Sequence, residues 1–246
     1  MLILLLLLLQ NTTTVQIMAN IITTNILHNF LAATQSSYST ASVTPTANRV
    51  CLFLVGASGG TTPNVPTVTG ASVTWTQVAT VAINGFVRLT VFRTYNTSPG
   101  TGALTIDFGG QNQDRCDWIL DDFQNTKVTG GNGADAIVQS ATNSGASASS
   151  LAATLSAFAN SANATYGGLV AQNATLRTIT AGSGYTKTIE QDTSDFMALA
   201  SQFRVDNDTT VDFTTSGTAS HLGVIGIELA NITPKASGGS FLLNFV

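Results

Sequence analysis

The chain has 246 residues, and its 9 Lys or Arg and 13 Asp or Glu side chains leave a formal net charge of −4 at pH 7. Only 9% of the residues are charged, whereas an ordinary soluble domain has roughly 25%. This composition excludes a nucleic-acid-binding protein, which needs a dense face of Lys and Arg, and a disordered chain, which combines low hydrophobicity with high charge. The length is sufficient for one large all-β domain or two small domains.

The first 48 residues contain no charged side chain and no glycine, and they begin with an apolar run at residues 2–9. This run is too short to span a bilayer, which takes about 20 residues in a helix. It has the length of a signal-peptide core, although no basic residue precedes it and no clear cleavage site follows before Met18, itself an alternative start. We expect residues 1–48 to form an apolar arm that packs on neighbouring subunits. Alternatively, residues from about 20 onward form the first strand of the domain.

From residue 49 onward, short apolar segments alternate with Gly, Asn, Ser and Thr, a pattern typical of strands joined by turns. Residues 50–55 are apolar at every position, which predicts a central strand buried on both faces. Alternating apolar residues predict further strands with one apolar face. These segments are residues 86–95, 104–108, 116–121, 197–205, 211–213 and 222–229.

Residues 149–160 fit two patterns. Leu151, Leu155 and Phe158 have helical spacing, whereas Leu151, Ala153 and Leu155 share one face of a strand. We favour a strand followed by a turn, because Ser and Thr occupy the alternate positions and Gly and Asn flank the segment.

Strand segments recur without intervening helices, which predicts an all-β fold, a jelly-roll-like antiparallel β-sandwich over residues 49–231. A linker and a short apolar tail follow at residues 232–246. Cys51 and Cys116 lack the close spacing of a zinc or redox motif. We expect free buried thiols, because a disulfide would require their two strands to be neighbours in space.

Residues 56–60 match the nucleophile motif G-x-S-x-G directly after a predicted strand, with Ser58 at the centre and His221 later in the chain. That motif requires a helix that begins at the serine. The residues that follow include Pro63 and Pro66 among β-branched residues, which prevents a helix there. We therefore predict a plain loop, no catalytic residue and no enzymatic activity.

Metal-binding patterns are weak in this sequence. His28 and His221 are its only histidines, and no H-x-x-x-H or C-x-x-C spacing is present, so we predict no metal site and no cofactor. Asp121 and Asp122, and the turn at residues 206–208, offer oxygen ligands for calcium. Neither has the spacing of a calcium loop, and Asp-Asn-Asp is also ordinary turn chemistry.

Carbohydrate-directed chemistry has two sets of candidates. A glycosidase needs two carboxylates, and Glu190 and Glu228 are the only glutamates, so an aspartate would have to complete a pair. Glu228 lies in the last predicted strand, which favours a sheet-surface or capping role. Trp118 shares its strand face with Cys116 and Leu120, so we expect it in the core. The aromatic residues considered for a sugar-stacking platform are Trp75, Tyr95, Trp118, Tyr166 and Tyr185.

Several short segments mark turns and core positions: SVTPTANR at 42–49, WTQVA at 75–79, Phe123 at the end of an acidic strand, GSGY at 182–185 and IEL at 227–229. Together they resemble a loosely defined family of jelly-roll domains that occurs in phage virion proteins and bacterial surface proteins. The resemblance covers about residues 20–230. It implies a fold and a setting, and it carries over no catalytic residue.

The expected function is structural, because a monomer with few charges would leave its apolar chain ends exposed to solvent, whereas an assembly can bury them. We expect a bacteriophage virion protein, a capsid decoration or cement protein or another shell-associated protein, that acts through self-association and contacts with other virion structural proteins. The alternative is a tail-fibre or surface adhesin, or a carbohydrate-binding module, with a glycan as its partner and an extracellular or cell-surface location. We expect no nucleic-acid partner and no membrane span.

Overall fold

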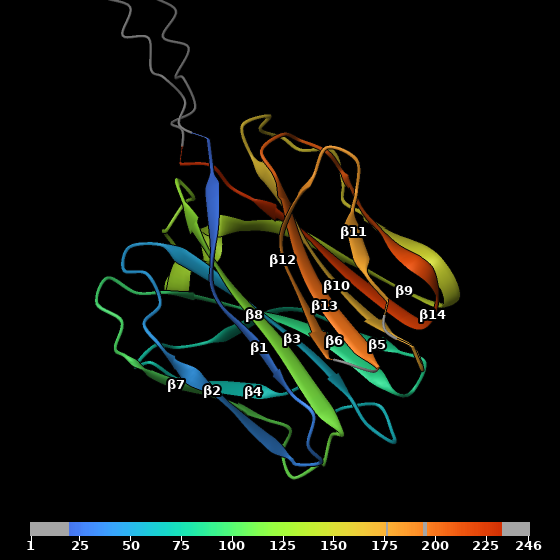
Figure 1. Ribbon diagram of the computed structural model, residues 1–246. Helices are drawn as coiled ribbons and strands as arrows, with labels where there is room; N and C mark the ends of the chain where they lie inside the picture. Colours follow the sequence, from blue (N-terminus) through green and yellow to red (C-terminus); the bar gives the residue numbers. More distant parts are fainter. Residues whose placement is uncertain (1–19, 176, 194–195, 233–246) are drawn as a thin grey trace, which may run out of the picture.

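The computed structural model describes residues 20–175, 177–193 and 196–232 (Figure 1). These residues are almost entirely in antiparallel strands, which confirms the predicted all-β sandwich. Three sheets are present in the described residues, and η1 (Gly131–Ala136) is a short 3-10 helix. The apolar run at residues 2–9 and the apolar tail at residues 241–246 lie outside the described residues.

The central sheet has the strand order β1-β8-β3-β6-β5. Its strands are β1 (Ile22–Leu31), β8 (Arg115–Gln124), β3 (Val50–Ser58), β6 (Val87–Tyr95) and β5 (Thr76–Ile83). A small sheet covers one face of it and consists of β2 (Ser37–Val43), β7 (Gly102–Asp107) and β4 (Thr67–Gly70). Because a sheet packs on each face, every residue of β3 is buried, as its apolar run predicts.

The large sheet covers the other face of the central sheet and has the strand order β11-β14-β10-β13-β12, with β9 paired to β14 (Figure 1). The main core lies between these two sheets, where Leu52 and Leu54 of β3 cluster with Val170 of β10 and Leu199 of β13. The chain completes the central and small sheets before it enters the large sheet. The strands of the large sheet are β9 (Ile137–Thr154), β10 (Ala164–Gln172), β11 (Ile179–Ala181), β12 (Thr186–Thr193), β13 (Met197–Arg204) and β14 (Thr210–Leu229).

Strands β9 and β14 are long and curl over the outer face of the large sheet (Figure 1). The curl coincides with a positive φ of 51° at Ser147 and with a shift in the register between the two strands. Val211 and Phe213 at the start of β14 thereby join the core cluster on that outer face. Gly167 permits this approach, because a Cβ atom there would lie 2.4 Å from the Val211 side chain. Two segments predicted as separate strands are therefore one strand, β14.

The ends of β9 and β13 test two further predictions. The segment after Ser149 is the end of β9, and Ala153 and Leu155 are buried, which confirms a strand rather than a helix. Phe203 of β13 packs in the main core as predicted. The prediction for Val205 is wrong, because this residue follows the end of β13 and is exposed.

The sandwich begins before residue 49. Strand β1 pairs with β8 at the edge of the central sheet, and β2 belongs to the small sheet. Residues from about 20 onward therefore provide the first strand of the domain, as the alternative prediction has it.

Candidate functional site

Ser58 lies at the end of β3, and its exposed fraction is only 2%. Residues 59–66, which connect β3 to β4, contain no helix, so the turn lacks the element that a nucleophile motif requires. His221 lies at the same end of the sandwich: its ring is 5.6 Å from the ring of Phe86, whose carbonyl accepts a hydrogen bond from the Gly59 amide. The fold brings the serine and the histidine to one end of the sandwich without building a nucleophile elbow.

Asp121 and Asp122 are neighbours on β8, so their side chains point to opposite faces of the central sheet. Asp122 forms an ion pair with Arg49, with 3.1 Å between Oδ1 and Nη1. Asp121 accepts hydrogen bonds from the Asn25 amide at 2.9 Å and from the Tyr166 hydroxyl at 2.7 Å. The two carboxylates therefore do not share the cation site that their adjacency allowed.

Asp121 links three strands from two sheets, because Asn25 lies on β1 and Tyr166 on β10. Burial raises the pKa of Asp121 to about 6, although both hydrogen bonds favour the charged form. Burial also raises the pKa of Tyr166. The Oδ1 atom of Asn25 lies 2.7 Å from Nδ1 of the exposed His28. This buried polar cluster therefore fastens the first described strand to the core.

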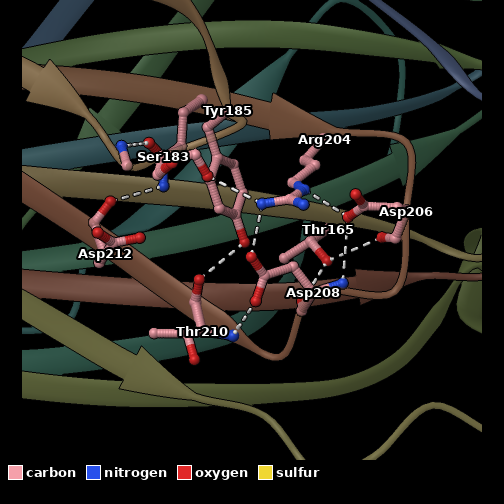
Figure 2. A network of polar contacts seen from close by, with 10 residues as sticks. Thr165, Ser183, Tyr185, Arg204, Asp206, Asp208, Thr210 and Asp212 are labelled. Carbon is pink, nitrogen blue, oxygen red and sulfur yellow. Dashed lines mark hydrogen bonds and ion pairs between the residues drawn. The ribbon is translucent and has the colours of Figure 1, made fainter.

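Asp206 and Asp208 surround Arg204 at the end of β13 (Figure 2). The Nε atom of Arg204 lies 2.5 Å from Oδ1 of Asp206, and Nη1 lies 2.7 Å from Oδ2 of Asp208. The guanidinium also donates to the Ser183 carbonyl at 2.8 Å and lies over the ring of Tyr185. The hydrogen bond to Asp206 and the neighbouring carboxylates raise the pKa of Arg204. The two aspartates considered for calcium thus bind an arginine that ties together the turns before β12 and β14.

Glu190 and Glu228 belong to separate networks. Glu228 is buried near the end of β14, and each of its oxygens accepts an amide hydrogen bond at 2.6 Å, from Gln139 and from Asn163. Glu190 is paired with Lys187. A sheet-surface position for Glu228 is therefore wrong, because the side chain is enclosed and holds two amide side chains in place.

The aromatic residues considered for a sugar platform do not form one. Three of them are buried: Trp118, as predicted, and Tyr166 and Tyr185. Trp75 packs against Phe53, with 5.5 Å between ring centroids. Among the described residues, the exposed aromatic side chains are Phe86 and Phe196, with exposed fractions of 46% and 42%. The sequence pattern does not single out either residue, because each immediately precedes a strand whose apolar alternation begins one residue later.

Cys51 and Cys116 are free and buried, which confirms the prediction. Their strands β3 and β8 are neighbours, but Cys116 lies opposite Ala57 and Cys51 lies opposite Asp122. At about 3.4 Å per residue, about 20 Å of strand separates the two thiols. Burial raises the pKa of Cys51 to about 12, so this thiol is protonated at neutral pH.

The first and last described residues meet at one end of the sandwich, here called the terminal end. The Asn125 side chain donates a hydrogen bond to the Asn20 carbonyl at 2.8 Å, and the Asn125 carbonyl accepts one from the Ile232 amide at 3.0 Å. The start of β1 and the segment after β14 accordingly lie side by side (Figure 1). A hollow of about 340 Å³ opens at this end and is lined in part by Arg49, Val128 and Ile232.

The opposite end of the sandwich carries the two exposed phenylalanines. Strand β8 runs from Arg115 at this end to the terminal end, and antiparallel β3 ends beside Arg115 at Ser58. We call this the aromatic end and define it by Ser58, Phe86, Arg115, Phe196 and His221.

Comparison of the chain with protein-family models, curated proteins and solved structures finds no match. Within the part of the chain that the structure describes, no helix has the length and apolar character needed to cross a membrane. The same residues contain no group of three or more His, Cys, Asp or Glu side chains arranged to hold a metal ion. The terminal end, with its hollow, and the aromatic end, with its exposed rings, are two candidate sites.

Proposed function

We propose that the protein is a structural component of a bacteriophage particle, a capsid decoration or cement protein or another shell-associated protein. The meeting of the first and last described residues, Asn20 and Ile232, at Asn125 carries this proposal. Residues 1–19 are uncharged and include the leucine-rich run, and residues 241–246 are apolar except for one asparagine. Because both segments are attached at the terminal end, both can enter the same neighbouring subunit.

The energetics favour attachment through apolar contacts. Each large apolar side chain buried on a neighbour contributes roughly 1.5–3 kcal/mol before the ordering cost is subtracted. Two further apolar side chains, Ile22 and Ile232, are about half exposed at the terminal end, with exposed fractions of 51% and 50%. With only 9% charged residues, the chain has few groups for a salt-dependent interface.

The test measures incorporation into particles. Mass spectrometry of purified particles gives the copy number of the protein relative to the major shell protein, for the full chain and for chains lacking residues 1–17 or 241–246. We expect each deletion to leave the thermal unfolding temperature unchanged and to lower the copy number, with the larger loss for residues 1–17. A control in which residues 2–9 are all serine separates lost apolar contact from lost length.

Two results contradict the proposal: absence of the full chain from purified particles, or unchanged incorporation of both deletion variants. The second candidate function is a tail-fibre or surface adhesin. Phe86 and Phe196 favour it, because exposed aromatic rings at the end opposite the attachment point are available for a ligand.

A further inference from the structure

We propose that the aromatic end binds an oligosaccharide through sugar rings stacked on Phe86 and Phe196. This inference does not depend on a virion setting, because it rests on side chains at the end of the sandwich remote from the chain ends. Each phenylalanine immediately precedes a core strand, β6 or β13, so its backbone is held in place while almost half of its side chain stays exposed.

The two rings lie at the end of the sandwich where side chains of the central sheet meet side chains of the large sheet. Ser58 of β3 lies between Val87 of β6 and Arg115 of β8, so these outer positions are separated by two strand spacings, about 10 Å. Phe86, next to Val87, contacts His221 of the large sheet. Phe196 of the large sheet contacts Arg115. The two aromatic contacts therefore bridge the sheets on either side of Ser58. The spacing of the two outer strands at this level is comparable with the length of a disaccharide.

Each ring has a supporting partner. The Arg115 guanidinium lies 4.6 Å from the centroid of the Phe196 ring, and the His221 ring is tilted by 51° against Phe86. These contacts restrain the aromatic side chains and leave 46% of Phe86 and 42% of Phe196 exposed. Restrained rings with open surface bind a flat apolar ligand face at a low cost in entropy.

Gln172 and Arg115, which are both partly exposed, lie between and beside the rings, whereas Ser58 is buried. On the large sheet, Gln172 of β10 lies opposite His221 of β14 on one side and Met197 of β13 on the other. It is therefore at the centre of its sheet edge, as Ser58 is on the central sheet. Among the described residues, Arg115 has no carboxylate partner, unlike Arg49 and Arg204. A hydroxyl or carboxylate of the ligand can accept a hydrogen bond from this guanidinium.

This alternation of apolar rings and polar groups favours a carbohydrate over a protein partner. A protein interface takes a contiguous apolar patch, whereas here two separate rings flank polar positions. A sugar presents the matching surface, with C–H faces for the aromatic rings and hydroxyl groups for the polar side chains.

The test is a glycan array of neutral and acidic oligosaccharides probed with the full-length protein, followed by calorimetric titration of the best ligand. We expect Phe86→Ala and Phe196→Ala each to weaken the affinity about fivefold to tenfold, and Phe86→Tyr to retain it. Val138→Ala, which also removes an exposed apolar side chain but lies on β9, should leave the affinity unchanged.

Three outcomes overturn the inference: no oligosaccharide bound by the full chain, equal affinity of both alanine variants and the unsubstituted chain, or an oligomer that dissociates on Phe86→Ala. The last outcome assigns the rings to an interface between copies. Incorporation of Phe86→Ala and Phe196→Ala into particles at the normal copy number would leave the proposed structural function intact, so the two proposals fail separately.

Discussion

The terminal end and the aromatic end close the same sandwich with different kinds of contact. At the terminal end, Arg49 pairs with Asp122, Arg204 pairs with two aspartates, and Glu228 accepts two amide hydrogen bonds. At the aromatic end, the part of the chain that the structure describes shows no ion pair, and Arg115 lies over the ring of Phe196. One end is held by paired charges, of which Asp122 and Glu228 are buried, whereas the other presents aromatic surface to solvent.

The difference shows how a chain with few charges uses them. Paired or hydrogen-bonded carboxylates fix turns in one geometry, because an alternative geometry would leave a buried charge without a partner. They gather at the terminal end, where the first and last described residues meet at Asn125. Exposed rings add little to folding and are therefore free to serve binding.

The largest expected effect comes from removing an enclosed charge at the terminal end. Asp122→Ala should lower the free energy of unfolding by about 3 kcal/mol, because Arg49 then loses its carboxylate in a partly buried site. Urea denaturation followed by tryptophan fluorescence measures the change. The matched control is Asp114→Ala at the aromatic end, where the exposed carboxylate should matter little. Equal losses in the two variants would remove the contrast between the ends.

An effect of similar size is expected from pH, at the buried cluster around Asp121. Because the pKa of Asp121 is about 6 in the folded protein and 3.8 without burial, the fold favours the protonated acid. The stabilising contribution is complete below about pH 4 and is lost as the pH rises through about 6, a difference of about 3 kcal/mol. Stability measured from pH 4 to pH 8, relative to Asp121→Asn, should fall by this amount. A flat difference between the two proteins would contradict the assignment.

The smallest effect is expected at the aromatic end. Phe86→Ala and Phe196→Ala should each lower the free energy of unfolding by less than about 1 kcal/mol, since each ring is almost half exposed. Thermal and urea denaturation of the two variants provide the measurement. Phe123→Ala, which removes a fully buried ring, should cost about 3–5 kcal/mol. A loss at Phe86 as large as that at Phe123 would mean that the ring supports the core.

Several strands in all three sheets could be predicted from local patterns. The run at β3 is apolar at every position because sheets cover both of its faces, and the alternation along β6 and β7 matches the faces that they bury. The β9 segment could be assigned because Ser and Thr at alternate positions suit a strand exposed on one face. These predictions depend only on the spacing of apolar residues along a strand and on which face they bury. Both can be read from a few neighbouring residues in the sequence.

The candidate sites could not be predicted in this way. Asp121 and Asp122 are adjacent residues of the same type, so the sequence does not distinguish them. Adjacent strand residues face opposite sides of a sheet, and Asp121 therefore accepts a hydrogen bond from Tyr166 whereas Asp122 pairs with Arg49. The aromatic platform was sought among Trp and Tyr, whereas the exposed rings are phenylalanines that only the ends of β6 and β13 bring to one surface.

By itself, the sequence determined the all-β class, the buried strands, the free thiols and the scarcity of charge, because these properties follow from composition and from apolar spacing over a few residues. Tertiary structure alone decided the third sheet, the curl of β9 and β14, and the partner of each charge. It also brought Asn20 to Asn125, which are 105 positions apart in the chain. Periodicity identifies the face that a residue buries, but strand order determines what that face meets, and strand order is a property of the whole fold.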